Sequence, residues 1–255
     1  MDELEKIDRS LMRFIIGAHS KVPSEMLYLE TSAIPLRHVI SIRRMVYFQT
    51  LITREDGELT KKVYETQKIN PSKGDWIEHL KEDFQFIDEN IDEKVAKEMT
   101  KLQYKTMIKK KIRQKVFENL KTVQQSHSKV KDIIYKTFKM QDYMNNHILT
   151  NHEISLLFAL RSRSVRNVAN NFGQEKNCPL GCQSQDKQEH WIACSKTLAN
   201  QGTTLKYSDI YGDISEQTVI VKLFAQLEQE REELTAREAP GSPVAAITGP
   251  RPLGP

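Results

Sequence analysis

Long stretches of this chain contain neither glycine nor proline, and this absence of helix breakers constrains its fold more than any other feature. From Val95 to about Val123, for example, apolar residues recur at three- and four-residue steps without a breaker. No convincing strand pattern accompanies them. The sequence therefore predicts a mainly α-helical protein, with helices over residues 2–17, 24–29, 35–52, 59–67, 75–87, 95–123, 129–144, 152–167 and 215–237.

All three cysteines of the chain lie in one short segment, together with a histidine. Cys178, Cys182, His190 and Cys194 have the spacing C-x3-C-x7-H-x3-C. A short turn lets the first two thiolates reach one ion, and a four-residue step places the last two ligands on one face of a helical turn. Four protein ligands leave no position for water, so the spacing predicts a structural zinc site. The alternative is three free cysteines that happen to cluster, beside a surface histidine.

The cysteines also bear on the cellular compartment. An odd number, confined to one segment, argues against a disulfide framework and for a reducing compartment. We therefore expect an intracellular protein of the nucleus, the cytoplasm or both. The first ten residues are acidic and polar, unlike a signal peptide, and no apolar run approaches the roughly 18 residues of a membrane span. No membrane partner is expected.

Charge is distributed unevenly along the middle of the chain. Residues 75–98 contain nine acids and three lysines, a balance of −6, whereas residues 101–140 contain twelve bases and two acids, a balance of +10. Such asymmetry indicates a polyanionic partner, RNA or DNA. A solvated lysine-rich helix face would give the same pattern. The candidate phosphate contacts in this region are Lys109, Lys110, Lys111, Arg113 and Lys115.

Further candidate contacts lie around the cysteine segment. Arg161, Arg163 and Arg166 precede it, and closely spaced guanidinium groups suit phosphate. They equally suit a solvated helix end, where cations favour the helix dipole. Trp191 follows the ligand His190 and could stack on a base, or pack over the metal loop instead.

These observations predict the organisation of the chain. We expect an elongated multi-helix array with a small zinc-stapled loop module and a disordered tail. The expected regions are a helical region over 1–90, a basic helical region over 91–168, the zinc module over 169–200, a helical segment over 201–238 and the tail over 239–255. No hydrolase or transferase motif and no pair of adjacent aspartates occurs in the chain, so we expect no enzymatic activity from it alone.

Four phrases of the sequence resemble the region downstream of the polymerase core in non-LTR (LINE-type) retrotransposon reverse transcriptases. Together they span residues 11–194, and their order matches that family. They are LMRFIIGAHSKVPSEMLYLETSAIPLRHVISIRRMVYFQTLI (11–52), KGDWIEHLKEDF (73–84), LLFALRSRSVRNVANNF (156–172) and CPLGC…EHWIAC (178–194).

The resemblance implies a helical thumb at the first phrase and a cysteine-rich motif at the last. It assigns the four ligand positions of that motif to the cysteines and histidine named above, although three residues separate the first two cysteines here where the family often has two. The family's polymerase needs paired aspartates in a palm domain, which this sequence lacks. We therefore expect a non-catalytic fragment that binds RNA template or target DNA. The alternative is a zinc-stapled helical module that binds protein and no nucleic acid.

Overall fold

The computed structural model describes residues 2–165, 177–178, 180–197 and 205–238. Within these residues the protein is mainly helical, with ten α-helices and no strand beyond one isolated bridge, which confirms the predicted class. The chain divides into two compact units, residues 1–145 and 146–255, which are considered separately. None of the helices in the described part is long and apolar enough to cross a membrane. The predicted tail, 239–255, lies outside the described residues.

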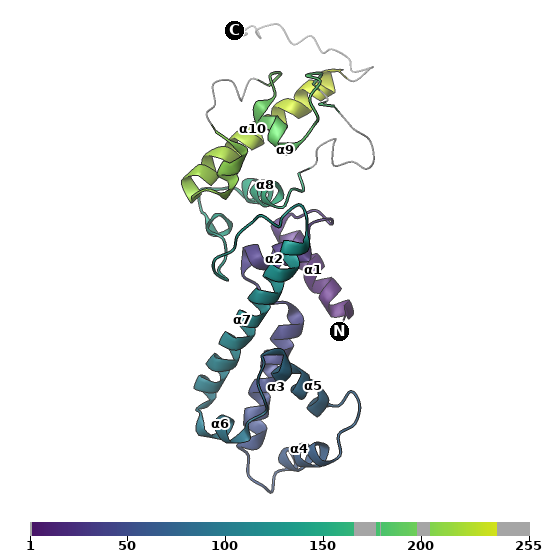
Figure 1. Cartoon of the computed structure of the whole chain (residues 1–255), viewed down its shortest axis with the longest axis vertical. Helices are drawn as coiled ribbons and strands as arrows, with labels where there is room; N and C mark the ends of the chain where they lie inside the picture. Colours follow the sequence, from purple (N-terminus) through teal and green to yellow (C-terminus); the bar gives the residue numbers. More distant parts are fainter. Residues whose placement is uncertain (1, 166–176, 179, 198–204, 239–255) are drawn as a thin grey trace, which may run out of the picture. The chain divides into compact units, whose positions relative to one another are not determined.

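The first unit consists of seven α-helices and one 3-10 turn. Its central helices, α3 and α7, lie side by side (Figure 1). The elements are α1 (Asp2–Ile16), α2 (Ser24–Thr31), α3 (Leu36–Ile52), α4 (Leu59–Ile69), α5 (Trp76–Phe86), α6 (Glu93–Glu98), α7 (Lys101–Ser126) and the 3-10 turn (Asp142–Asn145).

One core joins the helices before and after residue 90. Phe48 of α3 is fully buried and makes edge contacts with the rings of Tyr64 and Phe84, at centroid distances of 6.0 and 5.8 Å. Ile108 and Ile112 of α7 are fully buried in the same cluster. The unit boundary therefore falls at residue 145 and not at the predicted residue 90, because α7 completes the core that α3 and α5 begin.

The helix predicted over 95–123 is divided in two. Thr100 caps α7, since its hydroxyl accepts from the Gln103 backbone while the Gln103 side chain accepts from the Thr100 N–H. Gln49 of α3 donates to the carbonyls of Ala96 and Met99, both at 2.8 Å. These bonds satisfy carbonyl groups where α6 ends, so the break is held by the core.

The prediction of a helix over 129–144 is wrong, because the segment is irregular until the 3-10 turn at Asp142–Asn145. Side chains of other elements bind this segment's backbone and hydroxyl groups: Gln124 donates to the Val130 carbonyl, and the hydroxyls of Tyr135 and Tyr143 donate to Glu30 of α2. Glu30 is fully buried and both tyrosines are at most 4% exposed. The segment is therefore ordered by long-range polar contacts, which override its local helical pattern.

Helix α1 forms where predicted, and Gly17 follows it with a φ of +71° that suits a helix stop. Its apolar stripe nevertheless lies at the surface: Leu4, Ile7, Leu11, Phe14 and Ile15 are 48–84% exposed. The opposite side of α1 attaches the helix to α2 and α3. Buried Glu5 pairs with Arg37 of α3, and Asp8 accepts from the Tyr28 hydroxyl of α2.

The second unit contains α8 (Asn151–Arg161), α9 (Gln188–Ala193), a 3-10 turn (Tyr207–Tyr211) and α10 (Ile214–Glu238). Phe224 of α10 is fully buried and contacts the rings of Trp191 and Tyr207. Helix α8 ends at Arg161, earlier than the predicted residue 167, and α10 confirms the helix predicted over 215–237. The basic helical region predicted over 91–168 is therefore divided between the two units after residue 145.

The Glu30 contacts give a stability prediction. Tyr143→Phe removes a hydroxyl that donates to a buried carboxylate at 2.9 Å, so we expect the free energy of unfolding to fall by about 1–3 kcal/mol. Chemical denaturation followed by circular dichroism measures this. The matched control, Tyr47→Phe, removes a hydroxyl from a residue that is 44% exposed and should change it by at most about 0.5 kcal/mol. Equal effects of the two substitutions would contradict the assigned role of Glu30.

Candidate metal centre

The structure brings Cys178, Cys182, His190 and Cys194 together. Their three Sγ atoms and one imidazole nitrogen all lie within 4.8 Å of one another. Cys194 Sγ lies 3.9 Å from each of the other two Sγ atoms, close to the roughly 3.8 Å edge of a tetrahedron with metal–sulfur distances of about 2.3 Å. Cys182 Sγ lies 3.0 Å from His190 Nε2. The four residues could therefore hold a metal ion.

The local backbone explains how the first two ligands meet. The Gly181 N–H donates to the Cys178 carbonyl at 3.0 Å, and the Cys178 N–H donates to the Ser184 carbonyl at 2.7 Å. Gly181 has a φ of +73°, a conformation that a residue with a Cβ adopts only with strain. This tight turn directs both thiols to one side.

The other two ligands come from a helix end. His190 lies in α9, and Cys194 is the residue that directly follows the helix. Its N–H lies 3.5 Å from the Trp191 carbonyl. The H-x3-C spacing thus places both ligands at one helical turn, as predicted. Cys178 and Cys194 are buried, whereas Cys182 is half-buried.

A buried polar network connects this loop to α10. Arg231 of α10 donates to Asp186 Oδ1 at 2.6 Å, and its other terminal nitrogen lies 3.6 Å from Cys178 Sγ. The Trp191 indole donates to the same Asp186 oxygen at 3.2 Å, and the guanidinium lies 4.5 Å from the centre of the Trp191 ring. Asp186 is fully buried and Arg231 is 6% exposed. Three thiolates around a divalent ion would carry a net charge of −1, and the Arg231 guanidinium, paired with Asp186, would lie beside them.

Protonation of the ligands follows from their surroundings. Burial raises the pKa of the Cys194 thiol to about 11. Burial acts in the same direction on Cys182, but hydrogen bonds from the Ser184 backbone and the neighbouring thiols lower its pKa. Burial and the Arg231 charge lower the pKa of His190, which favours the neutral imidazole that binds metals. Metal binding must displace thiol protons, so affinity rises with pH.

Comparison with known proteins identifies no relative: no family model, no curated protein and no solved structure matches the chain. The site must therefore be interpreted from its own geometry.

The predicted nucleic-acid contacts on α7 fall into two groups. Lys109 and Lys110 are exposed and form no ion pair within the described residues. Lys111 pairs with Glu89, and Lys115 pairs with Asp88 at 2.6 Å. Arg113 donates to the Ser32 hydroxyl at 2.8 Å and the Phe138 carbonyl at 3.1 Å, so it holds the fold together.

The predicted contacts around the cysteine segment are largely engaged inside the second unit. Arg161 is 4% exposed and donates to the Ile210 carbonyl at 3.0 Å, and Trp191 is 3% exposed. Neither side chain offers a surface to a phosphate or a base, since both pack in the core of the unit. Arg163 is partly exposed and pairs with Glu189 at 2.5 Å. Arg166 lies outside the described residues.

Sequence reasoning missed two sets of residues, one beside the metal ligands and one on α7. Arg231 and Asp186 are 45 residues apart, and no spacing rule connects them. By contrast, Lys101 and Lys105 extend the predicted lysines of α7 at four-residue steps, a signal that was visible in the sequence.

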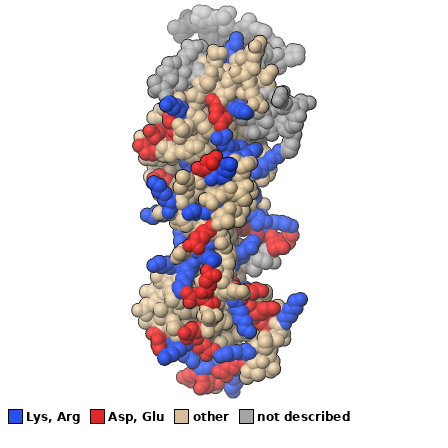
Figure 2. All heavy atoms as spheres, in the orientation of Figure 1, with Lys and Arg blue, Asp and Glu red and all other residues tan. Residues whose placement is uncertain are grey.

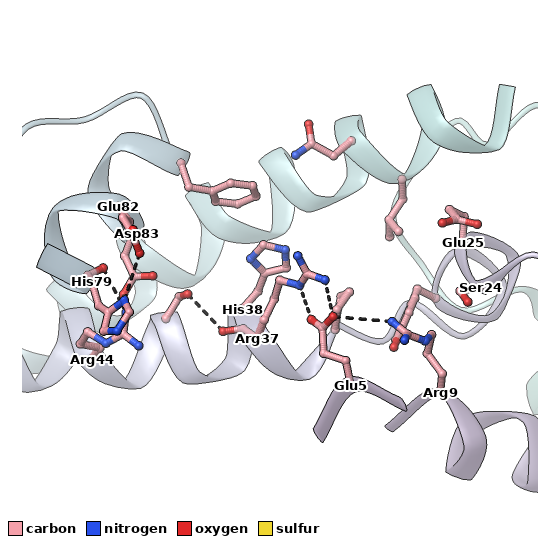
Figure 3. Close-up of a pocket in the computed structure, with 16 residues that line it drawn as sticks. Glu5, Arg9, Ser24, Glu25, Arg37, His38, Arg44, His79, Glu82 and Asp83 are labelled. Atoms are coloured by element: carbon pink, nitrogen blue, oxygen red, sulfur yellow. Dashed lines mark hydrogen bonds and ion pairs between the residues drawn. The ribbon is translucent and has the colours of Figure 1, made fainter. Parts of the chain in front are cut away.

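A separate groove of about 690 Å³ lies in the first unit among α1, α2, α3, α5 and α7 (Figure 3). Its arginines are each paired with a carboxylate of the groove: Arg9 and Arg37 with Glu5, and Arg44 with Asp83. Burial lowers the pKa of His38, at its centre, to about 4, so this imidazole is neutral at pH 7. The groove therefore offers no unpaired cation to an anionic ligand.

The ligand cluster predicts the effect of removing one donor. The full-length protein should bind one metal ion per chain, and His190→Gln should weaken binding and abolish the metal-dependent gain in thermal stability. Zinc titration and thermal melting measure both quantities. His147→Gln is the matched control, because His147 is an exposed histidine of the same unit outside the cluster. Equal binding by the two variants would exclude the site.

The Arg231 contacts predict a second effect. Arg231→Gln removes the cation beside Cys178 and leaves buried Asp186 uncompensated, so metal affinity should fall about 10- to 100-fold. Competition with a chelator measures the affinity. Arg163→Gln, an arginine of the same unit whose side chain is 43% exposed, should leave it within a few-fold of the wild type. An unchanged affinity in Arg231→Gln would show that Arg231 merely packs against the loop.

Proposed function

We propose that this chain is a non-catalytic nucleic-acid-binding protein, that Cys178, Cys182, His190 and Cys194 hold a structural zinc ion, and that its first unit binds phosphate through α7. The observation that carries the proposal is a row of exposed lysines on α7, Lys101, Lys105, Lys109 and Lys110, which form no ion pair with any residue that the structure describes. We call these four residues the lysine row. The zinc ion and the lysine row have different tasks, one maintaining a fold and the other making contacts.

The donor set supports zinc. Three thiolates and one imidazole suit this ion, and four protein ligands are typical of structural sites. Around the site the buried apolar cluster is small: Cys178, Leu180 and Cys194, with partly buried Cys182 and Leu234 packed against them. A loop with so little apolar burial gains its stability from the bound metal. The zinc therefore stabilises the second unit and performs no chemistry.

The lysine row supports nucleic-acid binding. Lys101, Lys105 and Lys109 follow one another at four-residue steps, and all three are exposed. Lys110 is exposed beside them, and the first acid of α7 is Glu118. Like charges at this spacing destabilise a helix by roughly 0.2–0.5 kcal/mol per pair. An anionic ligand relieves that repulsion, and a nucleic-acid strand supplies anions repeatedly along its length.

The charge distribution over the surface agrees with a local site and not a uniformly basic protein. Figure 2 shows acidic and basic side chains interspersed over the face that it presents. The net charge of the chain is only +4. Binding must therefore depend on where unpaired cations gather, and α7 is such a place.

We further propose that the chain derives from the region downstream of the palm in a non-LTR retrotransposon reverse transcriptase. The order of the four resembling phrases supports this origin. A helical first unit followed by a Cys3His cluster is compatible with a thumb and a cysteine-rich motif. The genomic sequence upstream tests it: a continuous reading frame that encodes paired palm aspartates would support the origin, and an unrelated upstream frame would oppose it.

The second candidate function is a protein-interaction module. It is favoured by the ion pairs of Lys111 with Glu89 and Lys115 with Asp88, through which the acidic and basic segments partly neutralise each other. These pairs leave the lysine row unneutralised, so nucleic-acid binding remains the preferred proposal.

The salt dependence of binding distinguishes the two functions. The full-length protein should bind RNA or DNA with an affinity that falls steeply with salt, and neutralising Lys105, Lys109 and Lys110 to Gln should lower the logarithmic salt slope by up to about 2–3. Fluorescence anisotropy from about 50 to 200 mM salt measures the slope.

A charge-matched control separates the site from net charge. Lys62, Lys81 and Lys94 are exposed lysines of the same unit outside α7, and their triple Gln variant should retain the wild-type slope. Equal slopes for both triple variants would remove α7 as the contact surface. Affinity that does not change with salt would remove the proposed function.

A further inference from the structure

A hollow of about 430 Å³ lies on the irregular segment between α7 and the 3-10 turn of the first unit. We propose that it seats an unstacked base of single-stranded nucleic acid, an inference that rests on the proposed function. Its lining is mixed: Ile134 and Met140 are apolar, Lys136 and Lys139 are cationic, and polar groups come from Tyr135, Thr137, Gln141 and Asp142.

The apolar walls are unusually open to solvent. Ile134 is 83% exposed and Met140 is 49% exposed, and both line the same hollow. An apolar side chain so exposed gains stability when a flat, weakly hydrated surface covers it. The face of a nucleobase is such a surface, and every base has one. The hollow therefore suits a base without selecting its identity.

The segment that forms the hollow is already ordered. Ile133 and Tyr135, on either side of Ile134, are only 8% and 4% exposed. The Phe138 carbonyl accepts from Ser32 at 3.0 Å, and the Gln141 N–H donates to the Glu30 carbonyl at 2.9 Å. Because these contacts fix the backbone before any ligand arrives, binding does not have to order the loop.

The charges around the hollow favour a polyanion over a protein partner. Residues 128–141 contain the exposed lysines Lys129, Lys131, Lys136 and Lys139 against one acid, Asp132. Asp142 also lines the hollow, but four lysines against these two acids leave the balance at +2. Lys136 and Lys139 line the hollow and are exposed, so they supply cations for the phosphates that flank a seated base. A paired duplex keeps its base faces stacked, so the geometry selects a single strand.

The experiment compares single-stranded and duplex RNA of equal length, each binding to the full-length protein. Ile134→Ser removes the apolar wall and should weaken single-strand binding about 5- to 10-fold while leaving duplex binding unchanged. Ile69→Ser is the matched control, since Ile69 is 77% exposed in the same unit and far from the hollow in sequence. Both variants should unfold at the wild-type temperature, because neither side chain is buried.

A fluorescent base analogue reports seating directly. A single strand that carries 2-aminopurine should change its fluorescence on binding to the wild type and to Ile69→Ser, and less on binding to Ile134→Ser. If all three proteins bind with the same salt dependence and give the same fluorescence, the hollow does not seat a base. The proposed binding through the lysine row would then be retained without this inference. If the wild type shows no salt-dependent binding, the proposed function fails and the inference fails with it.

Discussion

The packing of α7 against α3 determines which lysines of α7 point away from the core. Tyr104, Ile108, Ile112 and Val116 bury one face of α7 in the core of the first unit. Lys111 and Lys115 pair with Glu89 and Asp88, in the segment that follows α5. The lysines at 101, 105, 109 and 110 remain exposed. Helix α7 therefore carries two groups of lysines. Lys111 and Lys115 form ion pairs within the unit, whereas the four residues of the lysine row are exposed and carry the proposed binding site.

The cysteine loop of the second unit depends on polar contacts more than the core of the first unit does. Among the described residues, the apolar cluster around the four ligands is small, and Trp191 of the same segment packs separately against Phe224 of α10. The Cys3His cluster brings the two ends of the loop together, and the contacts of Arg231 with Asp186 and Cys178 join the loop to α10. A buried ion pair contributes little net stability by itself, because desolvation offsets the attraction. Arg231 also lies 3.6 Å from Cys178 Sγ, so its position in α10 is linked to the ligand cluster as well as to Asp186.

The sequence predicted those features that depend on neighbouring residues. The helix predicted over 2–17 matches α1, which ends just before Gly17, and the short spacing of rare ligand types indicated the ligand cluster. The cap at Thr100 was equally local, since Thr100 and Gln103 form a capping box, but the continuous apolar period concealed it. The segment after α7 could not be predicted in this way. Its conformation depends on Glu30, which lies more than 100 residues away in the sequence from Tyr135 and Tyr143.

The burial of Arg161 and Trp191 changes where contacts with a ligand are expected. Both were candidates because of their residue types, and both instead stabilise the second unit from inside. Arginine and tryptophan are suited to either task, since each combines a large flat surface with hydrogen-bond donors. Lysine differs, because its compact, strongly hydrated charge favours the surface. The exposed lysines of α7 are therefore the stronger basis for the proposed binding site, and the Cys3His cluster is the basis for a separate, structural role in the second unit.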